Sequence, residues 1–107
     1  MAYVSEVTDQ SFDEFARESG RALAYFYGTD CPICPKVTAA FEKVAGETGD
    51  DLRFLKVCIL DARETTRRYR ILGVPTILLL EDGKEISRMT GAIREEDLKG
   101  LTTKVSH

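Results

Sequence analysis

The segment ALAYFYGTDCPICPK, residues 22–36, joins a short apolar run to two cysteines that lie three positions apart. The apolar and aromatic residues 22–27 are typical of an inner β-strand. Beyond the cysteines, apolar residues recur at the spacing of one helix face: Val37, Phe41, Val44 and Ala45. The segment therefore predicts a strand that leads through Cys31 and Cys34 directly into a helix.

The rest of the chain alternates strands with helices. We expect further strands at residues 3–7, 52–60, 76–80 and 84–89, and further helices around residues 12–16, 62–70 and 98–101. Asp82-Gly83 favours a two-residue type I′ hairpin turn. This order predicts an α/β fold with helices on both faces of a mixed sheet. Because the chain has no repeat and no Pro/Gly/Ser linker, residues 1–107 are expected to form a single domain.

Composition excludes several classes of protein. A chain of 107 residues with 43% apolar residues can bury a core without help from disulfides or metal. The N-terminus shows no basic segment followed by an apolar stretch, and no apolar run is long enough to span a bilayer. We therefore expect a soluble, cytoplasmic protein with no membrane partner. We also expect it to act as a monomer. The net charge of -3 argues against nucleic acid as its partner.

Cys31 and Cys34 could form a metal clip, a structural staple, a reactive pair or two inert buried thiols. Residues three apart on a helix have Cβ atoms about 5 to 6 Å apart, so the pair lies close to disulfide geometry. A zinc site usually needs four ligands, and beyond the pair the chain offers only Cys58 and His107. A structural disulfide across so short a loop stabilises little. The residues favour a redox role, and two inert buried thiols remain the alternative.

The expected helix gives the two cysteines different surroundings. Cys34 falls in line with Val37 and Phe41, on the stripe that must face the core. Cys31 lies at the expected helix tip, where unpaired backbone N–H groups and the positive end of the helix dipole favour a thiolate. We therefore expect Cys31 to be the attacking sulfur and Cys34 the shielded, resolving one.

The chain resembles thioredoxins over its whole length, from VTDQSFDEF to EEDLKGL. The motifs that carry the resemblance are CPIC, YRILGVPT at residues 69–76, Gly83 in the hairpin and TGA at residues 90–92. The spacing from Cys31 to Pro75 and on to Gly91 agrees with the thioredoxin pattern without a gap. The resemblance implies the thioredoxin fold, a central mixed sheet of about five strands flanked by about four helices.

The resemblance also implies an activity and a binding edge. Val74-Pro75 would be a cis peptide facing the cysteines, with Thr76 starting the next strand and Gly91 beside it. The main chain of Val74 would pair with an extended substrate peptide. Cys31 and Cys34 would reduce protein disulfides by thiol–disulfide exchange, without metal or bound cofactor. An NADPH-linked thioredoxin reductase would return the pair to its reduced form.

Two departures from the family pattern flank Cys31. Pro32-Ile33 stands between the cysteines in place of the usual Gly-Pro and is closer to the Pro-Tyr of glutaredoxins, which leaves the reduction potential open over ~100 mV. Asp30 replaces the aromatic residue that usually precedes the first cysteine. Its charge either opposes thiolate formation at Cys31 by like-charge repulsion, or points outward as a helix N-cap.

Further departures concern proton transfer and packing. Tyr25 stands where thioredoxins keep a buried aspartate, and a phenol with a pKa near 10 cannot act as a base at neutral pH. Lys56 or a water could handle the proton of Cys34, although a strand lysine can also simply reach solvent. Tyr27 replaces a common tryptophan and is expected to pack beside the active site. Cys58 is most simply a small buried residue.

Two other functions are compatible with these residues. The CPIC motif favours a glutaredoxin-like reductase fed by glutathione, and a thioredoxin fold can also serve as a non-catalytic interaction or chaperone module. The expected helix at residues 62–70 is basic, which is explained either as a solvated helix face or as a docking patch for an acidic partner. Its arginines are Arg63, Arg67, Arg68 and Arg70.

Overall fold

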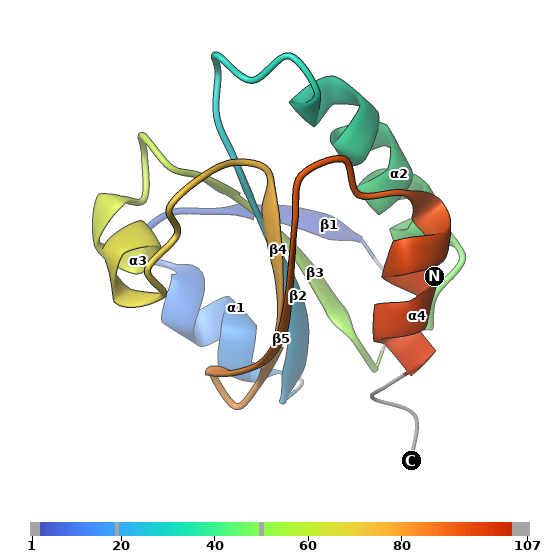
Figure 1. The fold of residues 1–107 in the computed structure, drawn as a ribbon. Coiled ribbons are helices and arrows are strands. Elements are labelled where there is room, and N and C mark those ends of the chain that lie inside the picture. The colour runs from blue at the N-terminus through green and yellow to red at the C-terminus, as the bar shows by residue number, and fades with distance from the viewer. Residues whose placement is uncertain (1–2, 19, 50, 104–107) are drawn as a thin grey trace.

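The structure is a computed structural model that describes residues 3–18, 20–49 and 51–103. Among these residues, five strands form one mixed sheet in the order β1-β3-β2-β4-β5 (Figure 1). The strands are β1 (Val4–Val7), β2 (Arg21–Tyr27), β3 (Arg53–Cys58), β4 (Thr76–Glu81) and β5 (Lys84–Thr90). β1, β3 and β2 run parallel, β4 is antiparallel to β2, and β5 is antiparallel to β4. The predicted mixed sheet is confirmed.

Helices cover both faces of this sheet, as predicted. The described helices are α1 (Phe12–Glu18), α2 (Cys34–Gly46), α3 (Arg63–Arg68) and α4 (Glu95–Thr103). α2 and α4 lie on one face, and α1 and α3 lie on the other (Figure 1). The chain therefore has three layers, with the apolar sheet in the middle.

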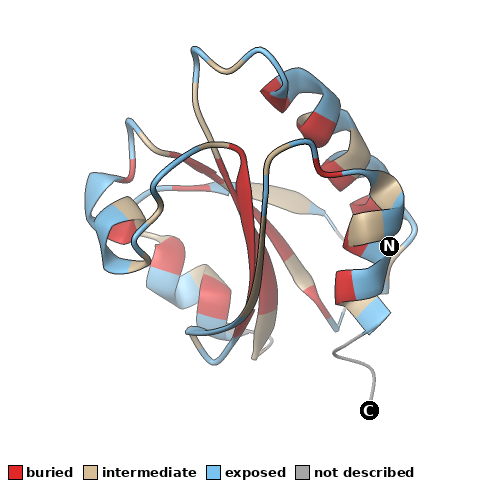
Figure 2. Cartoon of the chain, viewed as in Figure 1, coloured by how far each residue is buried: buried red, intermediate tan, exposed pale blue. Residues whose placement is uncertain are grey.

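The central strand β2 is buried on both sides. Leu23 and Tyr25 point into the core beneath α2 and α4, whereas Ala24 and Phe26 point into the core beneath α1 and α3. Figure 2 shows the buried residues concentrated along the middle of the sheet and on the inner sides of the helices. Two covered faces explain why this strand appears in the sequence as a continuous apolar run instead of an alternating one.

The hairpin between β4 and β5 fixes which ends of the strands meet. Asp82 and Gly83 have φ angles of 53° and 84°, the two positive values that a type I′ turn requires, which confirms the predicted turn. In the resulting register Thr76 pairs with Phe26 on one side and with Thr90 on the other. The end of β2, the start of β4 and the end of β5 therefore meet at one end of the sheet, drawn at the top of Figure 1.

Asp9 caps α3 from a distant part of the sequence. Its carboxylate accepts hydrogen bonds from the backbone N–H groups of Thr65 (2.8 Å) and Glu64 (3.1 Å) and from the Thr65 hydroxyl (2.7 Å). Partial burial pushes the pKa of Asp9 upward, but the hydrogen bonds from Thr65 and Glu64 outweigh it and hold the pKa below its ordinary value. The ionised carboxylate therefore stabilises the first turn of α3.

We expect Asp9→Ala to lower the free energy of unfolding by about 1 to 2 kcal/mol, the usual effect of removing a helix cap. A group whose pKa is lowered in the folded state adds stability above its unfolded pKa and loses it in acid. The difference between wild type and Asp9→Ala should therefore be full at neutral pH and shrink below about pH 4. Urea unfolding at several pH values measures this difference. Asp9→Asn, which keeps an acceptor oxygen, should fall between the two, and a difference that stays constant into acid would contradict the role of the ionised group.

Candidate active site

Cys31 and Cys34 form a disulfide just beyond the C-terminal end of β2, with their Cα atoms 5.3 Å apart. The two side chains differ in exposure: Cys34 is only 4% exposed, and Cys31 is partly open to solvent. Cys34 joins the buried face of α2 together with Val37 and Phe41, as the apolar spacing predicts. Cys31 is therefore the sulfur of the pair that another protein can reach.

The helix begins at Cys34 and not, as predicted, at Cys31. Ile33 is the N-cap residue, and the preceding turn is closed by a hydrogen bond from the Cys34 N–H to the Cys31 carbonyl (3.2 Å). Pro32 accounts for the exclusion of Cys31 from the helix, because a proline disfavours helical conformation in the residue before it. The N-cap interpretation of Asp30 is also wrong, since no side chain caps α2. The exposed carboxylate of Asp30 lies in the loop just before Cys31.

The first turn of α2 leaves the positive end of the helix dipole uncompensated. It contains no acidic residue. Pro35 occupies an early helical position whose N–H would lack an intrahelical partner in any case, so the proline costs little there. Lys36 adds an exposed positive charge in the same turn. This environment favours a thiolate nearby, with Asp30 as the one charge of the preceding loop that opposes it.

Tyr25 ties β2 to the first turn of α2. Its hydroxyl donates a hydrogen bond to the Cys34 carbonyl (3.0 Å) and lies 2.8 Å from the Thr38 hydroxyl. Because a carbonyl can only accept, the Tyr25 proton points to Cys34, and Thr38 must be the donor in the second bond. Burial raises the pKa of Tyr25, so the phenol stays neutral. Tyr25 is a positioning residue for Cys34.

Tyr27 and Lys56 lie with Glu6 on the face of the sheet that also carries Tyr25. The Lys56 ammonium lies 4.8 Å from the centroid of the Tyr27 ring, and the Tyr27 hydroxyl donates to the Glu6 carboxylate (2.7 Å). Burial, followed by the hydrogen bond to Glu6, raises the pKa of Tyr27. The Tyr27 ring lies 5.6 Å from that of Tyr25. Glu6 was missed in the sequence, because only the register of β1 against β3 reveals that it faces Lys56.

The Val74–Pro75 peptide bond is cis, the isomer that the resemblance implies. The Pro75 carbonyl accepts a hydrogen bond from the Gly91 N–H (3.1 Å), and Thr76 is the first residue of β4. Within the described part of the chain, the backbone N–H and C=O of Val74 form no hydrogen bond. The main chain of Val74 is therefore open to pairing with an extended peptide.

Gly28 brings this edge against the loop that carries the cysteines. A Cβ atom at position 28 would lie 3.3 Å from Cγ2 of Val74 and 3.7 Å from Cδ1 of Ile59. A larger residue would therefore push the edge away. Gly91 has a φ of +86°, which favours glycine where the chain leaves β5. Close packing at Gly28 places Val74 beside the loop that leads to Cys31.

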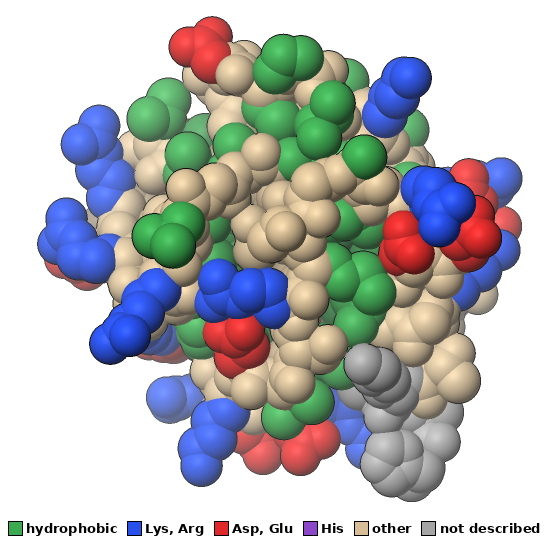
Figure 3. All heavy atoms as spheres, viewed as in Figure 1, with side chains coloured by type: hydrophobic (Ala, Val, Ile, Leu, Met, Phe, Trp, Pro, Cys, Tyr) green, Lys and Arg blue, Asp and Glu red, His purple; other side chains and the backbone are tan. Residues whose placement is uncertain are grey.

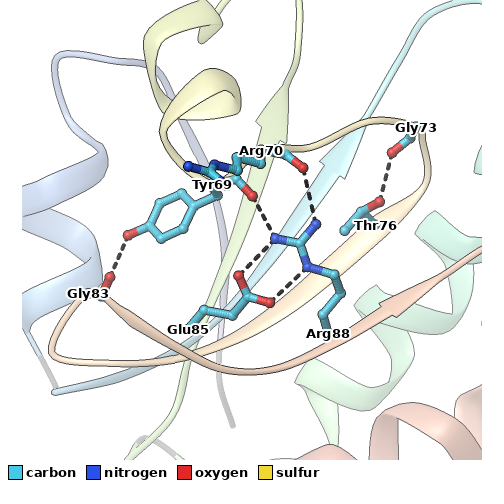
Figure 4. Close-up of polar contacts among 7 residues, drawn as sticks. All are labelled: Tyr69, Arg70, Gly73, Thr76, Gly83, Glu85 and Arg88. Carbon is cyan, nitrogen blue, oxygen red and sulfur yellow. Dashed lines mark hydrogen bonds and ion pairs between the residues drawn. The ribbon is translucent and has the colours of Figure 1, made fainter.

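Arg88 of β5 anchors the segment that leads to Val74. Its guanidinium donates to the carbonyls of Tyr69 (2.6 Å) and Arg70 (3.2 Å) and forms two 2.8 Å hydrogen bonds with the Glu85 carboxylate (Figure 4). These bonds satisfy carbonyls that the end of α3 leaves without helical partners. No local pattern in the sequence predicts this role, since Arg88 meets Tyr69 and Arg70 only through the sheet register.

In residues 3–18, 20–49 and 51–103, no group of three or more His, Cys, Asp or Glu side chains could hold a metal ion. No helix in the same residues is long and apolar enough to cross a membrane. Cys58 is a free, buried cysteine at the end of β3.

A family model described as Thioredoxin matches residues 3–104. The chain belongs to the thioredoxin family. The thioredoxin from Bacillus subtilis is 32% identical over 101 residues, which cover 94% of this chain and 96% of that protein. The thioredoxin from Mycobacterium tuberculosis is 33% identical over 88 residues, which cover 81% and 76%.

Solved thioredoxin structures have the same fold. A mutant thioredoxin from Halobacterium salinarum superposes with a TM-score of 0.88 at 25% identity, covering 97% of this chain and 91% of that one. The thioredoxin from Malassezia sympodialis, at 22% identity and a TM-score of 0.85 over 96% and 91%, supports the fold alone. Thioredoxin family membership and the Cys31–Cys34 disulfide together support a thiol–disulfide oxidoreductase.

We expect Tyr25→Phe to lower the free energy of unfolding by about 1 to 2 kcal/mol, because it leaves the Thr38 hydroxyl and the Cys34 carbonyl without their shared partner. Since Tyr25 does not ionise near neutrality, the variant should keep the wild-type dependence of activity on pH between about 6 and 8. Urea unfolding and the pH profile of insulin reduction measure the two effects. Tyr3→Phe, at an exposed tyrosine, is the matched control and should change neither. A shifted pH profile in Tyr25→Phe would show that the phenol takes part in proton transfer.

Proposed function

We propose that this thioredoxin-family protein reduces protein disulfides by dithiol–disulfide exchange, with Cys31 as the attacking sulfur and Cys34 as the resolving sulfur. The observation that carries the proposal is the asymmetry within one disulfide. Cys34 is buried on the core face of α2, whereas Cys31 is partly exposed. Val74 packs against Gly28 in the loop that leads to Cys31, and its main chain forms no hydrogen bond with the described residues. Such an arrangement suits attack by one sulfur and later release by the other.

The reaction proceeds in two exchanges. The Cys31 thiolate attacks one sulfur of a substrate disulfide, the substrate S–S bond breaks, and the leaving thiolate takes a proton. A mixed disulfide now joins Cys31 to the substrate. Cys34 loses its proton and attacks the Cys31 sulfur, so that the Cys31–Cys34 bond forms and the second substrate thiolate leaves and is protonated. Two electrons have passed to the substrate, and the protein is oxidised.

Binding of the substrate uses main chain more than side chains. An extended peptide pairs with the free N–H and C=O of Val74, in the manner of an added strand. Pro75, Thr76 and Gly91 form the rest of this edge, and the anchored segment before Val74 keeps it rigid. The substrate disulfide is thereby held over Cys31.

The proton of Cys34 needs an acceptor other than Tyr25, whose phenol is neutral and already donates to the Cys34 carbonyl. Water takes this proton in the proposed mechanism, because the Lys56 ammonium is a donor only and cannot accept another proton. Lys56 lies over the ring of Tyr27, the neighbour of Tyr25 on the same face of β2. The departure from the buried aspartate of the family thus moves the proton acceptor away from β2.

We expect the protein to work in the cytoplasm as a monomer, without a bound cofactor, and to receive its electrons from an NADPH-linked thioredoxin reductase. Compartments kept reducing by thiols are where such a dithiol is regenerated. The second candidate is a reductase fed by glutathione, favoured only by Pro32-Ile33 between the cysteines. A non-catalytic module is disfavoured, because both cysteines are retained together with the cis Val74–Pro75 peptide bond.

Two cysteine variants test the assigned roles. Cys31→Ser should abolish insulin reduction, while Cys34→Ser should still attack and should accumulate mixed disulfides visible by mass spectrometry. Cys58→Ala is the matched control and should keep full activity. In the reduced wild type, alkylation followed against pH should modify Cys31 first and at lower pH than an ordinary thiol, whose pKa is about 8.5. Reversed phenotypes, or earlier alkylation of Cys34, would show that the roles are exchanged.

The electron source separates the remaining functions. Insulin turbidity should develop with dithiothreitol and with thioredoxin reductase plus NADPH, and should stay at the uncatalysed rate with glutathione alone. Turnover driven by glutathione at a comparable rate would instead establish the glutaredoxin-like function. Suppression of insulin aggregation without any electron source would establish the non-catalytic function, provided that Cys31→Ser suppresses aggregation as well as the wild type does.

A further inference from the structure

A hollow of about 650 Å³ lies between α3 and the segment that leads to Val74; we call it the α3 groove (residues 59, 60, 63, 66, 67 and 70–72). Its apolar side chains are Ile59, Leu60, Ile71 and Leu72. Leu72 is 97% exposed and Leu60 is 52% exposed. Two leucines therefore remain in water beside a hollow, and exposed apolar groups gathered in this way mark binding surfaces more often than scattered ones do.

Unpaired positive charge surrounds the same groove. Three arginines line it: Arg63, Arg67 and Arg70. Within the described part of the chain none of them forms an ion pair, whereas the neighbouring Arg68 points away and binds Asp13 at 2.7 Å. Asp61 and Glu64 lie in the same stretch of chain but do not line the groove. In Figure 3, Lys and Arg side chains gather over α3 at the left of the view, next to hydrophobic ones.

The groove is continuous with the edge that is proposed to bind substrate. Ile59 donates its backbone N–H to the Tyr27 carbonyl (3.0 Å), so the groove begins where β2 ends. Ile59 and Val74 both pack against Gly28. Leu72 precedes Val74 by two residues, and the carbonyl of Arg70 is held by Arg88. A peptide chain paired with Val74 can therefore extend into the α3 groove without crossing a gap.

We propose that the α3 groove binds an acidic segment of a partner protein that also carries leucine- or phenylalanine-sized side chains. Arginine guanidinium groups bind carboxylates through two parallel hydrogen bonds, and the aliphatic lining removes apolar side chains from water. The protein as a whole carries a net charge of -3, so the groove is a local exception to its overall charge. Its aliphatic lining lacks the stacking surfaces on which single-stranded nucleic acids depend.

The binding does not depend on the cysteines, but its consequence for catalysis rests on the proposed function. A partner held by the groove would present a nearby disulfide to Cys31 at a high local concentration. Disulfides flanked by acidic and apolar residues would then be reduced with a lower KM and an unchanged kcat.

Cysteine-free, fluorescein-labelled peptides test the binding step on the full chain. The probe is a short synthetic peptide in which leucines alternate with aspartates; one matched peptide carries lysines in place of the aspartates, and another carries serines in place of the leucines. Fluorescence anisotropy should show the leucine–aspartate peptide binding at least about tenfold more tightly than either control at low salt. Its affinity should fall as salt is raised, because the arginines are exposed.

Variants on the groove locate the site. Arg67→Glu should weaken binding of the leucine–aspartate peptide by about tenfold, and Leu72→Ser by several-fold, while Lys84→Glu, with the same change of charge at a residue outside the groove, should stay within about twofold of wild type. Arg67, Leu72 and Lys84 are exposed, so thermal melts should confirm that all three variants fold. Amide shifts in NMR spectra should change most at residues 59–72.

Several results would overturn the proposal. The first two are equal binding of the lysine peptide and unchanged binding in Arg67→Glu and Leu72→Ser. The third is tighter binding of a single-stranded oligonucleotide than of the leucine–aspartate peptide. The fourth is self-association of the protein that Leu72→Ser abolishes, because it would assign the groove to a second copy of the chain. Peptide binding that persists in Cys31→Ser, together with loss of insulin reduction, separates the groove from the redox chemistry. Failure of binding with intact insulin reduction would remove the groove and leave the proposed function standing.

Discussion

The hydrogen bond from the Tyr25 hydroxyl to the Cys34 carbonyl joins the centre of the sheet to the start of α2. Tyr25 is fully buried between Phe41 and Tyr27, so its position is set by the core. Thr38 holds the same hydroxyl from the next turn of the helix. The first turn of α2 is thereby fixed against β2, and the sulfur of Cys34 is held in the core. The burial of Cys34 follows from this constraint.

Around this fixed turn, Cys31 and the main chain of Val74 are open at the surface while their neighbours hold them in place. Pro32 keeps Cys31 out of the helix, so its sulfur projects from a turn at the positive end of α2. In the proposed function, the edge at Val74 must stay unpaired to accept a peptide and yet remain in place. The Thr76 hydroxyl, which donates to the Gly73 carbonyl (2.7 Å), holds it from one side, and Arg88 holds the preceding segment from β5 (Figure 4). Anchoring through neighbours leaves the main chain of Val74 itself free.

Local patterns in the sequence predicted the elements, the hairpin turn and the burial of Cys34, because each depends on residues close together in the chain. Contacts that depend on the register of distant strands could not be predicted in this way. The cap of α3 by Asp9 joins residues more than fifty positions apart, and Glu6 meets Tyr27 only because β3 lies between β1 and β2. The wrong N-cap at Asp30 has a local cause, since Pro32 disfavours helical conformation at Cys31, the residue that an N-cap at Asp30 would place first in the helix.

At this end of the sheet, main-chain pairing can hold a peptide, whereas side-chain contacts can distinguish one peptide from another. Backbone N–H and C=O groups are common to all peptides, so the Val74 edge can hold an extended chain without distinguishing one sequence from another. Discrimination needs side chains, and the ones next to this edge are the exposed leucines of the α3 groove and its arginines, which form no ion pair within the described residues. Charges in water act over about 8 to 10 Å at physiological salt, which is far enough to bias an approaching peptide before its main chain pairs. In the proposed arrangement, the groove therefore decides which partner arrives, and the Val74 edge decides how its disulfide is held over Cys31.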